Sequence, residues 1–227
     1  MQPSTHMDEI RRVSRGRPLN ASRAASTDPL SQTMQLMGAM MAYPHNTEIF
    51  GENEPADYLY KVISGSVRTY KILSDGRRQV GGFYLPGDIF GLEFSDEHTL
   101  SAEAISDAKV LVVKSSALSA LAARDPSVAQ QLFALTGREL HRVQDRILLL
   151  IKNARERVAS FLLEMAERAS QNNTIELPMS RQDIADYLGL TIETVSRTLT
   201  SLETASAIEV SASSRRIVLR NRAALAA

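Results

Sequence analysis

The sequence of 227 residues contains no cysteine. A chain without thiols forms no disulfide, holds no cysteine-ligated iron–sulfur cluster and uses no thiol nucleophile. The sequence also lacks any run of eighteen apolar residues, and its first thirty residues carry five arginines without the apolar core of a signal sequence. We therefore expect a cytoplasmic protein that has no contact with a membrane.

A net charge is also missing, because 26 basic residues balance 26 acidic ones. The balance is uneven along the chain: residues 1–38 carry +2, residues 39–137 carry −4 and residues 138–227 carry +2. This mild asymmetry is weak support for nucleic-acid binding by the C-terminal end. The length exceeds that of a typical single domain, and 44% hydrophobic residues suffice for more than one core, so we expect two domains.

The first half of the chain changes character near residue 39. Residues 1–38 are rich in Ser, Arg, Ala and Pro without a helical or strand period, which predicts a flexible tail. Residues 39–124 consist of short alternating runs punctuated by glycines, which is typical of a β-roll. Asp75-Gly76 lies between two such runs and predicts a tight hairpin turn.

A long helix is predicted over residues 125–153, because apolar side chains recur there with alternating spacings of four and three. The positions of this seam are Ala129, Phe133, Thr136, Leu140, Val143, Ile147 and Leu150. Such a helix either lies on the β-roll or pairs with its twin in a homodimer. The sustained heptad and its flanking charges favour the homodimer, with Phe133, Leu140, Val143, Ile147 and Leu150 in the interface.

Residues 154–227 predict three helices followed by a β-hairpin. Ser180 precedes Asp183 by three residues and is a candidate helix cap, Gly189 ends that helix, and Thr191 is a good cap for the next one. Two helices joined by so short a turn are a helix-turn-helix. The fold class is therefore α+β: an N-terminal β-roll, a long dimerisation helix and a C-terminal winged helix-turn-helix.

The second helix of this pair, in the stretch "TIETVSRTLTSL", places three polar side chains opposite an apolar face. In a helix-turn-helix this side faces the DNA major groove. Arg197 can donate to guanine, and Glu193 can accept from cytosine or adenine. Ser196 can adapt to different base edges or contact a thymine methyl. The alternative is a Glu193–Arg197 surface pair worth roughly 0.3 kcal/mol.

The basic hairpin that follows favours the DNA interpretation, because its two arginines are placed like a wing over the phosphate backbone. The predicted backbone contacts are Ser180, Arg181, Thr191, Thr194, Arg215 and Arg216. Double-stranded DNA is therefore the expected partner.

The segments "SGSVRTYKILSDGRRQVGGFYLPGDIFG" and "MSRQDIADYLGLTIETVSRTL", joined by the long helix, resemble the CRP/FNR superfamily of bacterial transcription regulators from about residue 40 onward. The E-x-x-S-R run at Glu193, Ser196 and Arg197 is similar to the recognition helix of the FNR and FixK branch. The resemblance implies a homodimer on a palindrome of TTGA-like and TCAA-like half-sites, read by these three residues. It also implies an activator that recruits RNA polymerase and controls low-oxygen respiration, denitrification or nitrogen-fixation genes.

Two departures from the family pattern favour a FixK-like protein. The cysteine cluster of FNR-type oxygen sensors is absent, and His98-Thr99 stands where cyclic-AMP-dependent members place an Arg-Ser or Arg-Thr pair. A neutral histidine is a poor substitute for a bidentate cation. We therefore predict no cofactor. The alternative is a CRP-like regulator that depends on a cyclic nucleotide or another small effector.

Catalysis is not predicted. The four histidines, at positions 6, 45, 98 and 141, lack metal-ligand spacing, and no phosphate loop or nucleophile motif is present. The chain ends in "AALAA", residues 223–227, which is similar to tails that bacterial Clp-type proteases recognise; the alternative is a frayed terminus.

Overall fold

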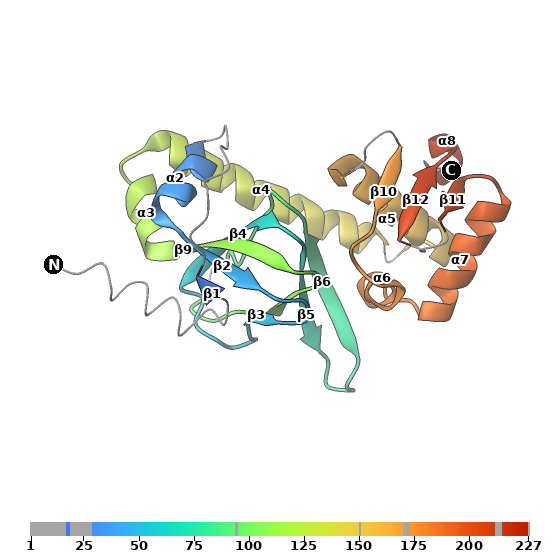
Figure 1. Cartoon of the computed structure of the whole chain (residues 1–227), viewed down its shortest axis with the longest axis horizontal. Helices are drawn as coiled ribbons and strands as arrows, with labels where there is room; N and C mark the ends of the chain where they lie inside the picture. Colours follow the sequence, from blue (N-terminus) through green and yellow to red (C-terminus); the bar gives the residue numbers. More distant parts are fainter. Residues whose placement is uncertain are drawn as a thin grey trace. The chain divides into compact units, whose positions relative to one another are not determined.

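The computed structural model describes residues 17–18, 29–93, 95–149, 151–169, 173–211 and 215–226. The chain forms two compact units (Figure 1). The first comprises Met1–Ile72 and Gly81–His141, and the second comprises Leu73–Val80 and Arg142–Ala227. A short segment from the first half of the sequence therefore belongs to the C-terminal unit.

Two antiparallel sheets form the β-roll of the first unit, as the alternating runs predicted. One sheet has the order β1 (Arg17–Pro18), β2 (Ala39–Tyr43), β9 (Ala108–Lys114), β4 (Tyr58–Ser64) and β7 (Ile89–Phe90). The other has the order β3 (Glu48–Phe50), β8 (Ser101–Ala104), β5 (Val67–Ile72) and β6 (Arg78–Tyr84), and the first three residues of β6 belong to the second unit. A core rich in aromatic residues lies between the sheets, because alternate residues of each strand point inward.

Three helices cover the outer face of the five-stranded sheet: α2 (Pro29–Met37), α3 (Ser115–Ala122) and the first half of α4 (Pro126–Leu149). Leu111 of β9 and Leu118 of α3 are buried in this second core, together with Leu135 of α4. Helix α4 runs unbroken for 24 residues, in agreement with the long helix expected from the heptad.

Helix α2 is a correction to the flexible tail predicted over residues 1–38. Leu30 and Met34, one helical turn apart, are buried in the same core as α3, and the side chain of Gln131 accepts a hydrogen bond from the backbone N–H of Leu30. Arg17–Pro18 pairs with β2. The rest of the predicted tail, residues 1–16 and 19–28, lies outside the described residues.

The second unit contains the three predicted helices, α5 (Ala154–Ala169), α6 (Arg181–Leu188) and α7 (Ile192–Thr204). They pack with a small antiparallel sheet of order β10 (Thr174–Glu176), β12 (Arg216–Leu219) and β11 (Ile208–Val210). Strands β11 and β12 are the predicted hairpin, whereas β10 and the terminal helix α8 (Arg222–Ala226) were not predicted. No helix within the described ranges is long and apolar enough to cross a bilayer.

The β5–β6 hairpin turns where Asp75-Gly76 predicted it. Gly76 has φ +84°, and its N–H donates to the carbonyl of Leu73 at 2.9 Å. The N–H of Leu73 in turn donates to the carbonyl of Arg77 at 2.8 Å. The tip of this hairpin, Leu73–Val80, is the segment that belongs to the second unit.

Candidate nucleic-acid interface

Helix α6 begins with the predicted capping arrangement. The Ser180 hydroxyl accepts a hydrogen bond from the backbone N–H of Asp183 at 3.1 Å, and the Asp183 carboxylate accepts from the backbone N–H of Ser180 at 3.0 Å. This reciprocal pair satisfies two donors at the helix start. Ser180 is exposed at its surface and Asp183 is buried. The start of α6 is therefore fixed in place.

The turn between the helices follows from Gly189, which adopts the left-handed conformation at φ +64°. The N–H of Leu190 donates to the carbonyl of Ala185 at 3.0 Å and closes α6. The Thr191 hydroxyl then accepts from the backbone N–H of Thr194 at 3.2 Å and opens α7. The geometry is the helix-turn-helix that the sequence predicted.

Helix α7 is anchored on one face and open on the other. Val195, Leu199 and Leu202 are buried in the core of the unit. Glu193 and Arg197 are exposed on the opposite face. Because the buried residues fix the helix, the exposed side chains are presented in a defined direction.

Glu193 is held as a carboxylate at the start of α7. Its own backbone N–H, the Thr191 hydroxyl and the positive charge of Arg197 together lower the pKa of Glu193 below its ordinary value. A carboxylate in the first turn of a helix is also favoured by the helix dipole. Glu193 is therefore an acceptor of hydrogen bonds, as contact with a base amino group requires.

Ser196 differs from its two neighbours because it is half-buried and already has a partner. Its hydroxyl accepts a hydrogen bond from Nη1 of Arg181, the first residue of α6, at 3.3 Å. Two of the predicted site residues, one from each helix, are thus in direct contact.

The wing contributes two exposed cations. Arg216 begins strand β12 and Arg215 immediately precedes it. Residues 212–214, between the two strands in the sequence, lie outside the described residues. At the other end of β12, Arg220 forms an ion pair with Glu209 of β11. The hairpin is therefore closed by an ion pair at one end and carries positive charge at the other.

The apolar seam of α4 faces solvent over most of its length. The exposed fraction is 81% for Phe133, and the side chains of Leu140, Val143 and Ile147 are more than half exposed. Leu150 lies outside the described residues. Large apolar side chains aligned on one helix face are characteristic of a surface that a partner covers.

The β-roll interior is filled by rings around His98. The His98 ring is 1% exposed and stacks on Phe50 with 3.6 Å between ring centroids. Tyr60 packs beside both, 5.1 Å from Phe50 and 6.4 Å from His98. Burial lowers the pKa of His98, and the negative charges of Glu93 and Glu54 oppose this effect only in part. His98 is therefore a neutral packing residue here, which is unlike the exposed cation that an anionic ligand needs.

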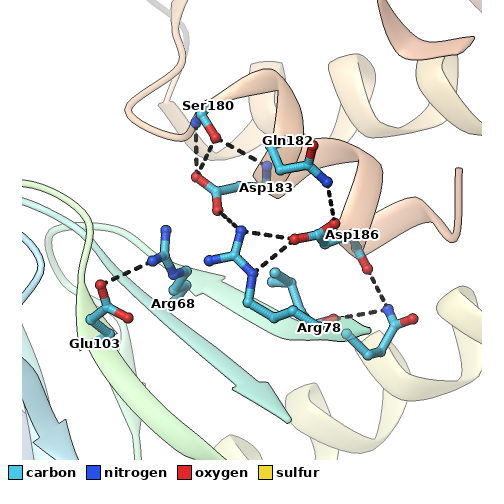
Figure 2. A network of polar contacts seen from close by, with 9 residues as sticks. Arg68, Arg78, Glu103, Ser180, Gln182, Asp183 and Asp186 are labelled. Carbon is cyan, nitrogen blue, oxygen red and sulfur yellow. Dashed lines mark hydrogen bonds and ion pairs between the residues drawn. The ribbon is translucent and has the colours of Figure 1, made fainter. Parts of the chain in front are cut away.

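One group of side-chain contacts was not predicted from the sequence. At the hairpin tip, Arg78 pairs with Asp183 and Asp186 of α6 (Figure 2). The Gln79 side chain donates to the backbone carbonyl of Asp186. No local motif marks these residues, since they lie more than one hundred positions apart in the chain. In the part of the chain that the structure describes, no three His, Asp or Glu side chains gather as metal ligands.

These features define a class of protein: a winged helix-turn-helix of the DNA-binding type, joined to a β-roll and a long helix with an apolar face. The family of Crp-like helix-turn-helix domains matches residues 156–227, and the family of cyclic nucleotide-binding domains matches residues 40–125.

Relatives of known name agree with this class. The chain is 49% identical to the nitrogen fixation regulation protein FixK of Azorhizobium caulinodans, over 86% of this chain and 81% of that protein. It is 42% identical to FixK of Rhizobium meliloti, over 73% of this chain and 76% of that protein. The structure of FixK2 from Bradyrhizobium japonicum superposes with a TM-score of 0.80 at 53% identity, covering 83% of this chain and 96% of that one.

The chain therefore belongs to the CRP/FNR family of transcription regulators, and within it to the FixK-like branch. It is a DNA-binding regulator and not an enzyme, as the sequence predicted.

Proposed function

We propose that this protein is a homodimeric activator that binds a palindromic operator built of TTGA-like and TCAA-like half-sites. The observation that carries the proposal is the presentation of Glu193 and Arg197 on the open face of α7, whose other face is anchored by buried residues. In this proposal Arg197 donates to guanine and Glu193 accepts from a base amino group, with Ser196 between them. Reading by rigidly held side chains gives sequence specificity.

The contacts to the DNA backbone are proposed for residues at the edges of this surface. Ser180 and Arg181 lie at the start of α6 and Thr191 and Thr194 at the start of α7, where helix N-termini favour phosphate groups. The exposed arginines of the wing, Arg215 and Arg216, would contact phosphates beside the half-site. These contacts set affinity and position without reading sequence.

The homodimer is proposed from the exposed seam of α4. A palindromic operator requires two copies related by a two-fold axis, and an apolar helix face is self-complementary across such an axis. Phe133, Leu140, Val143 and Ile147 would meet their counterparts there, with Leu150 continuing the seam. The alternative, in which this face packs on the chain's own β-roll, has less support because these described side chains are exposed.

The genes under control are proposed from the relatives. Proteins named for nitrogen fixation regulation, and a transcriptional activatory protein of Rhodopseudomonas palustris that is 42% identical over 71% of this chain, support an activator. We propose that the dimer recruits RNA polymerase, in the cytoplasm, to genes of low-oxygen respiration, denitrification or nitrogen fixation.

Effector dependence is the second candidate, because the cyclic nucleotide-binding family matches the β-roll. The ring stack around His98 argues against an anionic ligand at that position. One experiment tests both candidates: selection of DNA fragments from random sequence by the purified protein, with and without cyclic AMP. Our proposal expects the same TTGA/TCAA palindrome in both arms, whereas enrichment that requires cyclic AMP would establish effector dependence.

Turnover by a Clp-type protease is a further proposal that the structure modifies. Leu225 is 5% exposed and belongs to α8, which packs on α5, so this leucine of the tail is less accessible than the proposed recognition requires. Recognition of the final Leu-Ala-Ala would therefore require α8 to detach from α5. Regulation of protein level by such release would suit a regulator without a ligand switch.

A further inference from the structure

The hairpin tip Leu73–Val80 is part of the DNA-binding unit, and Arg78 attaches it to α6 (Figure 2). The Arg78 guanidinium lies between two carboxylates of α6. Its Nη2 atom is 2.6 Å from Oδ1 of Asp183 and 2.8 Å from Oδ2 of Asp186, and its Nε atom also donates to Asp186 at 2.8 Å. The Asp183 side chain is only 5% exposed, so this contact is largely shielded from water.

Asp183 uses its two oxygens for two different purposes. Oδ2 accepts hydrogen bonds from the backbone N–H and the hydroxyl of Ser180 and so caps α6. Oδ1 accepts a hydrogen bond from Nη2 of Arg78. The guanidinium therefore holds the same carboxylate that fixes the start of the helix. A carboxylate buried to this degree is costly unless it is paired and hydrogen-bonded.

The hairpin holds α6 at two further points. The Gln79 side chain donates to the backbone carbonyl of Asp186 at 2.6 Å. The carbonyl of Val80 accepts from Arg146 of α4 at 2.9 Å, and the Arg146 guanidinium lies 4.7 Å above the ring of Tyr187. Because residues 183, 186 and 187 share one face of α6, the whole face is held by this group of contacts.

We propose that Arg78 is a positioning residue for DNA binding. By pairing with both Asp183 and Asp186 it fixes α6, and α6 in turn positions α7 through their mutual packing and through the Arg181–Ser196 hydrogen bond. The positive charge of Arg78 also reduces the repulsion that these two carboxylates would exert on phosphates near the start of α6. The inference rests on the proposed operator, but it concerns a residue that is not one of the proposed base-reading residues.

The test compares Arg78→Met with Arg77→Met, and operator affinity is measured by fluorescence anisotropy. Arg77 is the matched control: it carries the same charge on the same hairpin, its side chain is 77% exposed, and it pairs with Asp75 beside it. We expect Arg78→Met to weaken operator binding about tenfold and Arg77→Met to change it less than twofold. The preference for matched over single-base variant operators should stay unchanged, because Arg78 contacts no base.

A second pair of variants separates positioning from loss of folding. Arg78→Lys keeps one charge but cannot span both carboxylates, so its affinity should fall between those of the wild type and Arg78→Met. Adding Asp186→Asn to Arg78→Met should restore part of the affinity, because it removes an unpaired charge. Affinity is expressed per active molecule from a stoichiometric titration, and far-UV circular dichroism checks that each variant is folded.

The outcomes distinguish this inference from the proposed operator. A wild type that does not discriminate the palindrome from scrambled DNA would refute the operator, and the variants would then be compared on the sequence that the wild type selects. On a DNA that the wild type does select, equal losses for Arg78→Met and Arg77→Met would overturn the positioning role. Tighter binding by Arg78→Met would also overturn it, because the contact would then be inhibitory.

Discussion

Nη1 of Arg181, at the start of α6, donates a hydrogen bond to the Oγ atom of Ser196 on α7 over 3.3 Å. Because the oxygen accepts, the hydroxyl hydrogen of Ser196 is directed away from Arg181. In the proposed complex the Ser196 hydroxyl can therefore donate to a base acceptor, and its second lone pair remains able to accept.

Arg181→Met should have a double effect on operator binding. Loss of a phosphate contact should make the slope of the logarithm of the binding constant against the logarithm of salt concentration shallower. The change is about one counterion per half-site, since each neutralised phosphate contributes roughly that amount. Release of Ser196 should also relax preference at the base pair that it reads. Titrations of matched and single-base variant operators at several salt concentrations measure both quantities. A change in slope with full retention of base preference would show that Arg181 does not orient Ser196.

The dimer seam is tested by replacing Leu140 and Ile147 together with Glu. Like charges would then be buried across the two-fold axis at a cost of several kcal/mol, and we expect a monomer that does not bind the operator. Sedimentation velocity measures the association state. Ala134→Glu with His141→Glu is the control, because these exposed residues have the same seven-residue spacing on α4 away from the seam. A double seam variant that still sediments as a dimer would place the interface elsewhere.

His98 should make the β-roll sensitive to acid. Burial lowers the pKa of His98 below its ordinary 6.5, so the unfolded chain binds a proton at a higher pH than the folded chain does. The free energy of unfolding is therefore fully retained above about pH 6.5 and falls as the pH drops below that value. The midpoints of urea unfolding at pH 7.5 and pH 5.5 should differ less for His98→Phe than for the wild type. The phenylalanine keeps the stack on Phe50. An unchanged difference would mean that other groups cause the acid sensitivity.

The C-terminal tail predicts opposite effects for two substitutions. Leu225→Ala should loosen α8 from α5 and shorten the half-life of the protein in cells, because the tail is then exposed more often. Ala226→Asp with Ala227→Asp should lengthen the half-life by removing the recognised end. Pulse-chase measurements in cells with and without the Clp-type protease test this idea. Half-lives that do not respond to either change would exclude the tail as a degradation signal.

The helix-turn-helix could be predicted because its signals are local. Ser180, Gly189 and Thr191 each act within three or four residues, so their roles can be read from spacing alone. The long helix and the hairpin at Asp75-Gly76 were predictable for the same reason. The apolar seam of α4 could also be recognised from its spacing. The partner that covers it could not, because periodicity within one chain does not specify a partner.

Contacts between distant residues could not be predicted. The Arg78–Asp183 pair joins residues 105 positions apart, and neither residue type nor spacing indicates that they meet. Helix α2 was missed because a segment of nine residues is too short to show a clear helical period. Its stability comes from the tertiary packing of Leu30 and Met34. His98 was recognised as a departure from the family pattern, but its burial against Phe50 depends on the β-roll core.

Titration of Arg197→Ala against the matched palindrome and its single-base variants tests the central claim most directly. We expect the binding free energy to weaken by roughly 1 to 3 kcal/mol per half-site. The preference should relax at one base pair only, because only that pair loses a bidentate partner. Glu193→Ala should relax a neighbouring position with little change in salt slope. Arg215→Ala should weaken binding to all sequences about equally and reduce the slope by about one. If Arg197→Ala weakens every sequence equally, or weakens none, then Arg197 does not read a base and the recognition-helix assignment is wrong.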